Sequence, residues 1–356
     1  MDKINLLIVA TIITLFISLL LIFFLLTVKT KDKTSNILFA VFLLINAIDS
    51  SEPLFGLMFD RPSNLGIFRS SIAFLQIPVF YLYVLSVSYS DFKLKPKYLM
   101  HAIPFLIVNA VLVPRFYAVD DASKLDFIIN RKSMIELQFI HVLIHVQIIV
   151  YFAAIFMLLK RAKKLYLENN AGTHINSYNW LFQFATLLSI LYVVAIVKNI
   201  FKFSEYPDIS EWIKAGIMVM QPFIICWYLF KALNNPDLFR NIDSKLKLVK
   251  DIVSEEKINT ATVVTEKVYS EELLKLQQYM NEEKPFLNPS LTIQDVSNDT
   301  QIPVRDLSLL INHKLEQHFY EKYQLELFSH KVDADTFFKH ISRFASKDQP
   351  SLLRLA

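Results

Sequence analysis

Seven long apolar segments, separated by short charged stretches, occupy the first 235 residues of the chain. The first of them, residues 4–28, contains no charged side chain and exceeds the roughly 20 residues that a helix needs to cross the hydrocarbon core of a bilayer. The weakest is the second, which Asp49 and Glu52 interrupt. The sequence predicts seven transmembrane helices, at about residues 4–28, 36–58, 65–89, 98–117, 137–159, 178–201 and 211–233. A count of six or of eight helices also stays open.

Composition supports residence in a membrane and argues against several classes of site. Hydrophobic residues make up 54% of the chain, more than soluble domains usually contain. Only 4 glycines are present, which argues against glycine-rich phosphate loops and most dinucleotide sites. The single cysteine, Cys226, excludes an intramolecular disulfide and a cysteine metal cluster. We therefore expect no metal and no cofactor.

The connections between the apolar segments alternate in charge. Lysine and arginine cluster after the first, third, fifth and seventh segments, at residues 29–33, 93–97, 160–164 and 231–250. The connections in between are more acidic and contain Asp60, Asp120, Asp126 and Glu205. Because cytoplasmic loops carry the excess of positive charge, this pattern places the N-terminus outside and the C-terminal part in the cytoplasm.

Ionisable side chains inside apolar segments are costly in a bilayer and require an explanation. One interpretation is an outward-facing signal pocket for an unidentified small molecule or ion, formed by Asp49, Glu52, His141, His145 and Lys198. The alternative is structural, with Asp49 or Glu52 paired to Lys198, or with Lys198 and Lys214 extended to the interface. His141 and His145 share a helix face, but the spacing offers no third metal ligand.

The segment 236–269 links the apolar part to a more polar C-terminal part. Pro236 ends the seventh apolar segment, because proline disfavours helix in the residue before it. The spacing of Leu246, Val249, Ile252 and Val253 allows about two turns of helix–helix contact, fewer than a coiled coil usually has. A homodimer held through this linker is one arrangement that the pattern allows.

The C-terminal part contains three helical patterns. Ser270 is placed to cap a helix that ends near residue 281, before the prolines at 285 and 289. Thr292 is placed to cap a second helix over residues 293–300, followed by a turn at 301–302. Pro303 then opens a third helix that runs to about residue 314. Two short helices joined by a tight turn form the helix-turn-helix plan.

On this plan the last helix presents its side chains to the major groove of double-stranded DNA. The candidate DNA-contacting residues are Val304, Arg305, Ser308, Leu309, Asn312 and Lys314. Arginine suits guanine, asparagine and serine suit base edges or phosphate, and lysine suits the backbone. The alternative is a three-helix bundle that binds another protein or nothing.

Residues 283–293 resemble the opening of AraC-type DNA-binding domains, and residues 302–312 resemble the first recognition helix of that family. Lys314, Leu315, Phe319 and Tyr320 continue the likeness, which covers about residues 272–320. It is closest to the Bacteroidetes-like form, in which an apolar membrane region precedes the domain. The resemblance implies a transcription regulator of the bacterial cytoplasmic membrane that binds DNA through residues 303–312.

The chain departs from this family after Tyr320. AraC-type domains contain two helix-turn-helix units, and residues 321–356 are too few for a linker helix and a second unit. The end of the chain is either a damaged domain or a shortened variant. Three functions stay open: a DNA-binding sensor, a membrane receptor or transporter with a cytosolic interaction tail, and an inactive regulator. The sequence contains no phosphate loop and no nucleophile–base set that would indicate an enzyme.

The sequence as a whole predicts an all-α protein. A seven-helix transmembrane bundle over residues 1–235 is followed by a linker at 236–269, a small cytosolic helix-turn-helix domain at 270–320 and an irregular tail at 321–356.

Overall fold

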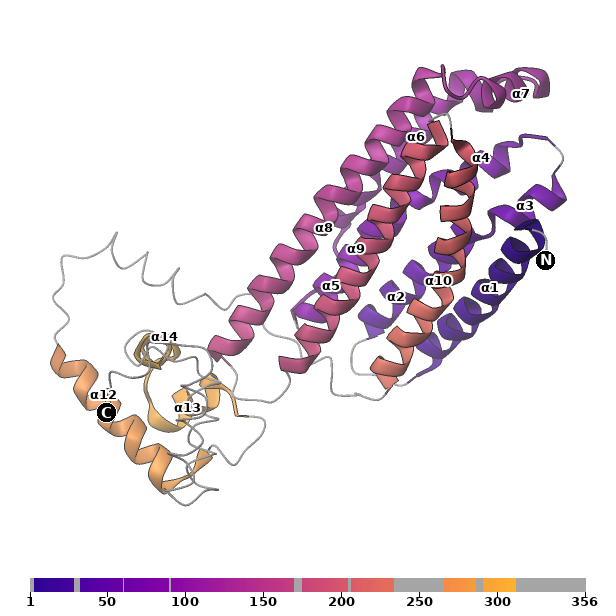
Figure 1. Ribbon diagram of the computed structural model, residues 1–356. Helices are drawn as coiled ribbons and strands as arrows, with labels where there is room; N and C mark the ends of the chain where they lie inside the picture. The colour runs from indigo at the N-terminus through magenta and orange to yellow at the C-terminus, as the bar shows by residue number, and fades with distance from the viewer. Residues whose placement is uncertain are drawn as a thin grey trace. The chain divides into compact units, whose positions relative to one another are not determined.

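The computed structural model describes residues 3–28, 33–59, 61–89, 91–169, 175–203, 206–233, 266–285 and 291–311. The chain divides into two compact units. The membrane unit comprises residues 1–160 and 177–244, and the C-terminal unit comprises residues 161–176 and 245–356. Every regular element within the described residues is helical, so the predicted all-α fold is confirmed (Figure 1).

The helices up to residue 233 include seven apolar spans. Their bounds are α1 (Lys3–Thr27), α2 (Lys33–Ser50), α3 (Glu52–Met58), α4 (Asn64–Ser71), α5 (Ala73–Ser88), η1 (Pro96–Ala102), α6 (Ile103–Leu112), η2 (Val113–Tyr117), α7 (Asp121–Ile129), α8 (Ile135–Asn169), α9 (Ile175–Phe203) and α10 (Pro207–Leu233). Seven stretches of the described chain are long and apolar enough to cross a membrane, which confirms the predicted count. The chain is a multi-pass membrane protein.

The second predicted span is not one helix. Residues 36–58 were predicted as a single segment, but α2 ends at Ser50 and α3 begins at Glu52. Pro53 lies in the first turn of α3, where a missing backbone N–H costs little. The third span is also divided, because α4 ends at Ser71 and α5 begins at Ala73. The polar residues that weakened the second prediction therefore lie at a break between helices.

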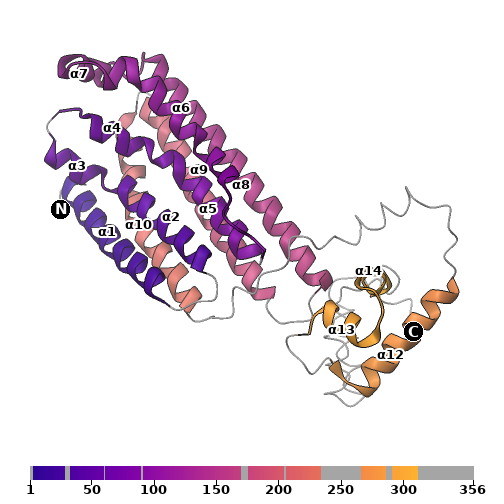
Figure 2. The ribbon, with the colours of Figure 1, turned by 180° about the vertical axis from the view of Figure 1, so that it is seen from behind.

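A short helix that the sequence analysis did not predict, α7, follows the fourth span. Asp120 caps it and accepts a hydrogen bond from the backbone N–H of Ser123 at 3.4 Å. The hydrogen bonds from the Ser123 side chain and backbone lower the pKa of the Asp120 carboxyl. Figures 1 and 2 both show α7 at the same end of the membrane unit as α3 and α4.

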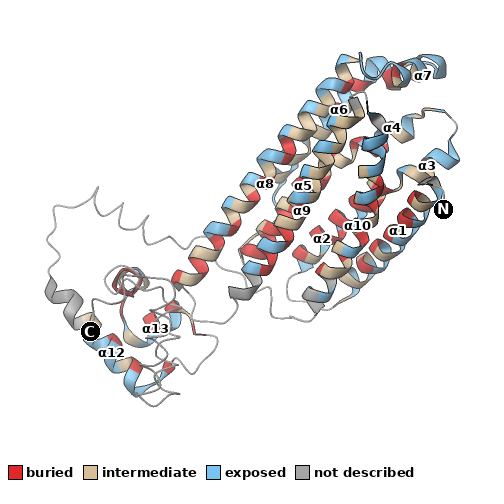
Figure 3. Cartoon of the chain, in the orientation of Figure 1, coloured by how far each residue is buried: buried red, intermediate tan, exposed pale blue. Residues whose placement is uncertain are grey.

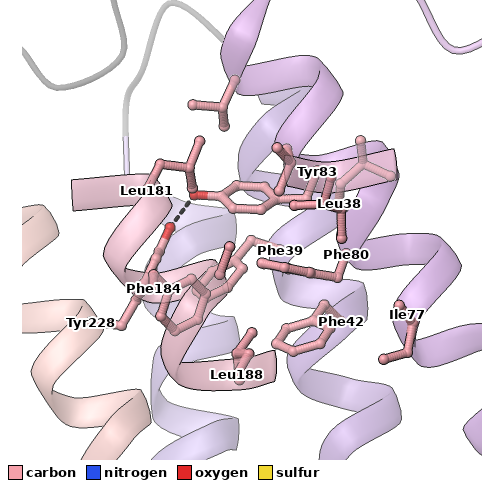
Figure 4. Packing of buried hydrophobic residues seen from close by; sticks show 14 of the residues in the cluster. Leu38, Phe39, Phe42, Ile77, Phe80, Tyr83, Leu181, Phe184, Leu188 and Tyr228 are labelled. Atoms are coloured by element: carbon pink, nitrogen blue, oxygen red, sulfur yellow. Dashed lines mark hydrogen bonds between the residues drawn. The ribbon is translucent and has the colours of Figure 1, made fainter. Parts of the chain in front are cut away.

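The core of the membrane unit is a cluster of aromatic rings from α2, α5, α9 and α10. The Tyr228 ring lies 4.3 Å from the Phe39 ring and 4.2 Å from the Phe184 ring, centre to centre. The hydroxyls of Tyr83 and Tyr228 share a hydrogen bond inside this cluster (Figure 4). On the outer face, by contrast, Phe23 of α1 is 71% exposed. Figure 3 shows exposed residues along the helices of the membrane unit. Apolar side chains on the outside of the bundle suit contact with lipid.

The C-terminal unit contains α12 (Glu266–Glu282), α13 (Ile293–Thr300) and α14 (Val304–Leu309). The predicted helix over 293–300 is confirmed, and Thr292 caps it through a capping box with Asp295. Two details were wrong. Ser270 lies inside α12, which begins four residues earlier, and Pro303 is the N-cap of α14 rather than its first residue.

A small apolar core holds these three helices together. It contains Leu276, Met280, Leu291, Ile293, Val296, Ile302, Leu307, Leu310 and Ile311. Gln301 makes the turn between α13 and α14 with a left-handed backbone, at φ 59°. The Ser297 hydroxyl donates to the Ile302 carbonyl at 2.6 Å and fixes the chain after this turn. The expected tail at 321–356, and the linker up to residue 265, lie outside the described residues.

Candidate functional site

A cavity of about 240 Å³ lies in the membrane unit, lined mainly by α2, α9 and α10. We name it the mixed-charge cavity, because its lining includes Asp49, Glu52, Lys198 and Lys214. The rest of its wall is largely apolar and includes Phe42, Leu43, Phe184, Leu188 and Ile225. A cavity with a few ionic groups over an apolar wall suits a small molecule that has both polar and apolar parts.

The break between α2 and α3 positions the two carboxylates of this cavity. Arg69, from α4, is only 7% exposed and donates to the carbonyl oxygens of Ile48 at 3.2 Å and Asp49 at 2.7 Å. These carbonyls belong to the last turn of α2, where no N–H of the same helix is available. Arg69 thereby stabilises the helix end, so that Asp49 closes one helix and Glu52 opens the next.

Glu52 and Lys214 form an ion pair at the cavity. The carboxylate Oε2 lies 2.8 Å from the lysine Nζ, and the two side chains are 55% and 21% exposed. The contact joins α3 to α10. Pairing of Asp49 or Glu52 with Lys198 was one alternative from the sequence, and the ion pair that the structure shows for Glu52 is with Lys214 of α10. Lys198 lines the same cavity from α9.

Neutral polar groups connect three helices beside the ionic groups. The Gln221 amide donates to Asn46 Oδ1, and the Ser50 hydroxyl donates to Gln221 Oε1 at 3.3 Å. The Thr11 hydroxyl donates to the Ser50 carbonyl, also at 3.3 Å. This chain of hydrogen bonds links α1, α2 and α10, and it satisfies polar groups that would otherwise be buried without partners.

A second cavity, of about 300 Å³, lies in the membrane unit and is lined by α4, α5, α6, α8 and α9 and by the end of α7. Its polar lining consists of Ser70, Ser71, Arg131, His141, Asn199 and Lys202. Among the described residues that line it, none is a carboxylate. We name it the cationic cavity. Its remaining wall is apolar, so the cations stand over a hydrophobic interior.

His141 and His145 lie one turn apart on α8 but make different contacts. His141 Nδ1 lies 2.7 Å from the Leu137 carbonyl oxygen, and His145 Nε2 lies 3.1 Å from the Asn199 amide nitrogen. His141 lines the cationic cavity, and His145 is in the lining of neither cavity. Across the described ranges, no group of three or more His, Cys, Asp or Glu side chains could hold a metal ion.

The five residues predicted to form one signal pocket therefore separate. The structure brings Asp49, Glu52 and Lys198 together in the mixed-charge cavity, and it places His141 in the cationic cavity. Sequence reasoning did not assign Arg69, Arg131 or Lys202 to a site. Arg69 and Arg131 lie between or at the edge of the apolar segments, where charged residues are common and do not by themselves indicate a site.

The predicted DNA-contacting residues differ in exposure. Arg305 is exposed and Val304 is half-buried, whereas Ser308 and Leu309 are only 3% and 4% exposed. As placed, Ser308 and Leu309 pack inside the unit rather than face a DNA duplex. Asn312 and Lys314 lie outside the described residues.

Two ionisable groups of the C-terminal unit are perturbed. Burial raises the pKa of the Glu272 carboxyl, and the nearby Asp306 carboxylate raises it further. Burial, together with a 2.6 Å hydrogen bond to Asp299, raises the pKa of the Tyr279 phenol.

No protein family matches the chain, and no curated protein or solved structure matches it either. Function is therefore inferred from the geometry.

Proposed function

We propose that the protein is a membrane-anchored transcription regulator, in which a signal at the membrane unit controls DNA binding by the C-terminal unit. The observation that carries the proposal is the pair α13 and α14. A capped helix, a left-handed turn at Gln301 and a second helix with exposed Arg305 near its start follow the helix-turn-helix plan. The AraC-type resemblance of residues 283–293 and 302–312 supports the same function.

The charge pattern of the loops supports the orientation that this function requires. Lysines and arginines follow the odd-numbered spans, and the positive-inside rule then places them in the cytoplasm. With seven spans, the C-terminal unit is cytoplasmic, where it reaches DNA, and the N-terminus is outside.

The mixed-charge cavity is the proposed signal site. Placing two carboxylates and two lysines within a bundle of apolar helices is costly, and a ligand that exchanges partners with them shifts helix positions. Because Glu52 is on α3 and Lys214 is on α10, a ligand that separates this pair acts on two helices together.

A receptor with a protein-binding C-terminal unit is the second candidate. The burial of Ser308 and Leu309 favours it, because two of the expected base-reading side chains are turned into the fold. On this reading α14 is a packing element and Arg305 contacts a protein.

Selection from random DNA duplexes by the full-length protein in lipid nanodiscs tests the proposal. We expect one sequence to be enriched. Arg305→Ala and Asn312→Ala should each weaken binding to it by about tenfold or more, because a base contact contributes about 1–3 kcal/mol. Lys275→Ala, which removes an exposed cation from α12, is the matched control and should leave the enriched sequence unchanged. A folded protein that enriches no sequence would overturn the regulator and favour the receptor.

A further inference from the structure

The lining of the mixed-charge cavity changes from charged to apolar along the bundle. On each of α2, α9 and α10, a charged side chain stands at one end of the lining face, and aromatic or aliphatic side chains stand at the other. The charged groups therefore gather at one end of the cavity. The lining runs from Asp49 to Phe42 on α2, from Lys198 to Phe184 on α9 and from Lys214 to Ile225 on α10.

The charged end of the cavity is also its more exposed end. The Glu52 and Lys214 side chains are 55% and 21% exposed, whereas Phe42 and Phe184 are buried. Both rings belong to the aromatic cluster of the core (Figure 4). A ligand would therefore enter with its apolar part first and keep its charged part beside Glu52 and Lys214.

The ionic groups among the described lining residues are balanced in sign. Glu52 and Lys214 form an ion pair at 2.8 Å, and the carboxylates of Asp49 and Glu52 both attract Lys198. A ligand with a single charge would pair with one member of the Glu52–Lys214 contact and leave the other without its partner, which is costly among apolar helices. A ligand that carries both an ammonium and a carboxylate compensates both members at once.

The lining also offers a neutral polar group that the protein itself does not use. Gln76 of α5 is only 6% exposed and lines the cavity, and its amide makes no hydrogen bond among the described residues. An amide has two donors and an acceptor, so it can bind either charged group of such a ligand. The cavity volume of about 240 Å³ is below the roughly 300–1,000 Å³ of sites for drug-sized ligands, which favours a small metabolite.

We propose that the mixed-charge cavity binds a zwitterionic α-amino acid with an apolar side chain. Its ammonium pairs with Glu52 and its carboxylate pairs with Lys214, while its side chain lies against Phe42 and Phe184. The inference names the ligand class of the proposed signal site, and it rests on the proposed function to that extent. On the proposed orientation the charged end faces outside, so the amino acid comes from the outer medium.

Calorimetry on the full-length protein in phosphatidylcholine nanodiscs tests the ligand class. The probes are leucine, methionine and phenylalanine, each titrated separately. Each has an amine analogue without the carboxylate and an acid analogue without the ammonium, which for leucine are 3-methylbutylamine and 4-methylpentanoate. Glycine carries both charges without the apolar side chain. We expect saturable binding of at least one probe, with its two analogues and glycine weaker by about tenfold or more. Equal binding of an analogue, or no binding of any probe, would overturn the proposal.

Substitutions at the ion pair locate the site, because they should change which analogue is preferred. Glu52→Gln removes the carboxylate that pairs with Lys214, so it should weaken amino-acid binding by about tenfold and strengthen binding of the acid analogue. Lys214→Gln should strengthen binding of the amine analogue instead. Asp208→Asn, at an exposed position in the first turn of α10 that does not line the cavity, is the matched control. Affinities unchanged in the folded Glu52→Gln protein would contradict the assignment.

The selection of DNA duplexes separates this inference from the proposed function. A protein that binds an amino acid but enriches no DNA sequence would lose the regulatory function and keep the ligand. A protein that enriches a sequence but binds none of the probes would keep the regulatory function and lose the ligand. Where both are found, we expect a saturating amino acid to change the affinity for the enriched sequence by about fivefold or more, and we expect Glu52→Gln to abolish this change.

Discussion

In the mixed-charge cavity, Glu52 and Lys214 face each other at 2.8 Å, whereas Arg131 and Lys202 share the cationic cavity with no carboxylate among the described lining residues. Both cavities lie within one helical bundle and both have apolar walls. The first is electrically balanced by the protein itself, and a ligand must displace an existing partner. In the second, the ionic side chains among the described lining residues are both positive, so Arg131 and Lys202 repel each other. The difference predicts opposite responses to the same kind of substitution.

The helix α4 lines the cationic cavity and also contacts the end of α2, a helix that lines the mixed-charge cavity. Arg69 donates to the end of α2 beside the mixed-charge cavity, while Ser70 and Ser71 line the cationic cavity. The Ser71 hydroxyl also donates to Asn109 Oδ1 of α6 at 3.2 Å. A change in the position of α4 would therefore alter the lining of the cationic cavity directly, and it would act on the mixed-charge cavity through the end of α2.

The largest effect is expected at Arg69. Arg69→Ala removes the guanidinium donor from the Asp49 carbonyl and one of the donors from the Ile48 carbonyl, which also accepts from Ser51, and should lower the free energy of unfolding by about 3 kcal/mol. Arg69→Lys should restore only part of the loss, because a single ammonium group cannot reproduce the planar set of donors of a guanidinium. Unfolding of the full-length protein in mixed micelles measures both. Arg61→Ala, at an exposed position on the same connection, is the control, and an equal loss there would contradict a specific role for Arg69.

A double-mutant cycle on Glu52→Gln and Lys214→Gln should give a smaller and favourable coupling. The pair is partly exposed, so about 0.5–1 kcal/mol is expected, and it should fall at high salt. The same unfolding measurement provides the four free energies. A coupling of zero would mean that the observed 2.8 Å contact does not stabilise the bundle.

The corresponding cycle on Arg131→Gln and Lys202→Gln should have the opposite sign. The two cations repel each other, so the coupling between them should be unfavourable by a few tenths of a kcal/mol. If both cycles had the same sign, the contrast between the cavities would be lost.

The smallest effect is a dependence on pH at α7. The pKa of Asp120 is below its ordinary value of 3.8, so its cap contributes stability above pH 3.8 and loses it as the pH falls through the lowered pKa. Hydrogen exchange of the α7 amides should accelerate under these acidic conditions. Asp120→Asn should keep the cap and remove the pH dependence, since asparagine caps helices without titrating. Exchange rates independent of pH in the unmodified protein, after correction for intrinsic exchange, would contradict this role.

Hydropathy predicted the number of spans because charged side chains are costly in lipid, so each spanning segment must be apolar along its own sequence. It did not predict the break at Ser51, because the Arg69 contact that stabilises it comes from another helix, 20 residues along the chain from Asp49. The α7 helix was missed for a different reason. Its cap residue Asp120 was considered only as one of the negative charges of the loop. An aspartate is also a helix-start signal, and Asp120 accepts from the backbone N–H of Ser123 three residues later.

The candidate site was predictable only in part. Asp49, Glu52 and Lys198 could be selected as costly groups in apolar segments, and they do share a cavity. Which lysine approaches Glu52 depends on the packing of α10, and sequence spacing carries no information on that. The histidines have the expected spacing on α8, but the rotation of that helix decides that only His141 reaches a cavity. In the C-terminal unit, periodicity located α13, whereas the burial of Ser308 depends on contacts across the unit.

The length of α8 has a mechanical consequence. At 35 residues the helix is about 52 Å long, well beyond the roughly 30 Å of a bilayer core, and its sequence contains neither proline nor glycine. Its first turns contribute Leu137 and His141 to the cationic cavity. A rod without a hinge acts as a lever, so a tilt of a few degrees at the cavity would displace the far end by several ångströms. A ligand too small to reshape the bundle could still produce a movement at that end comparable to the diameter of a water molecule.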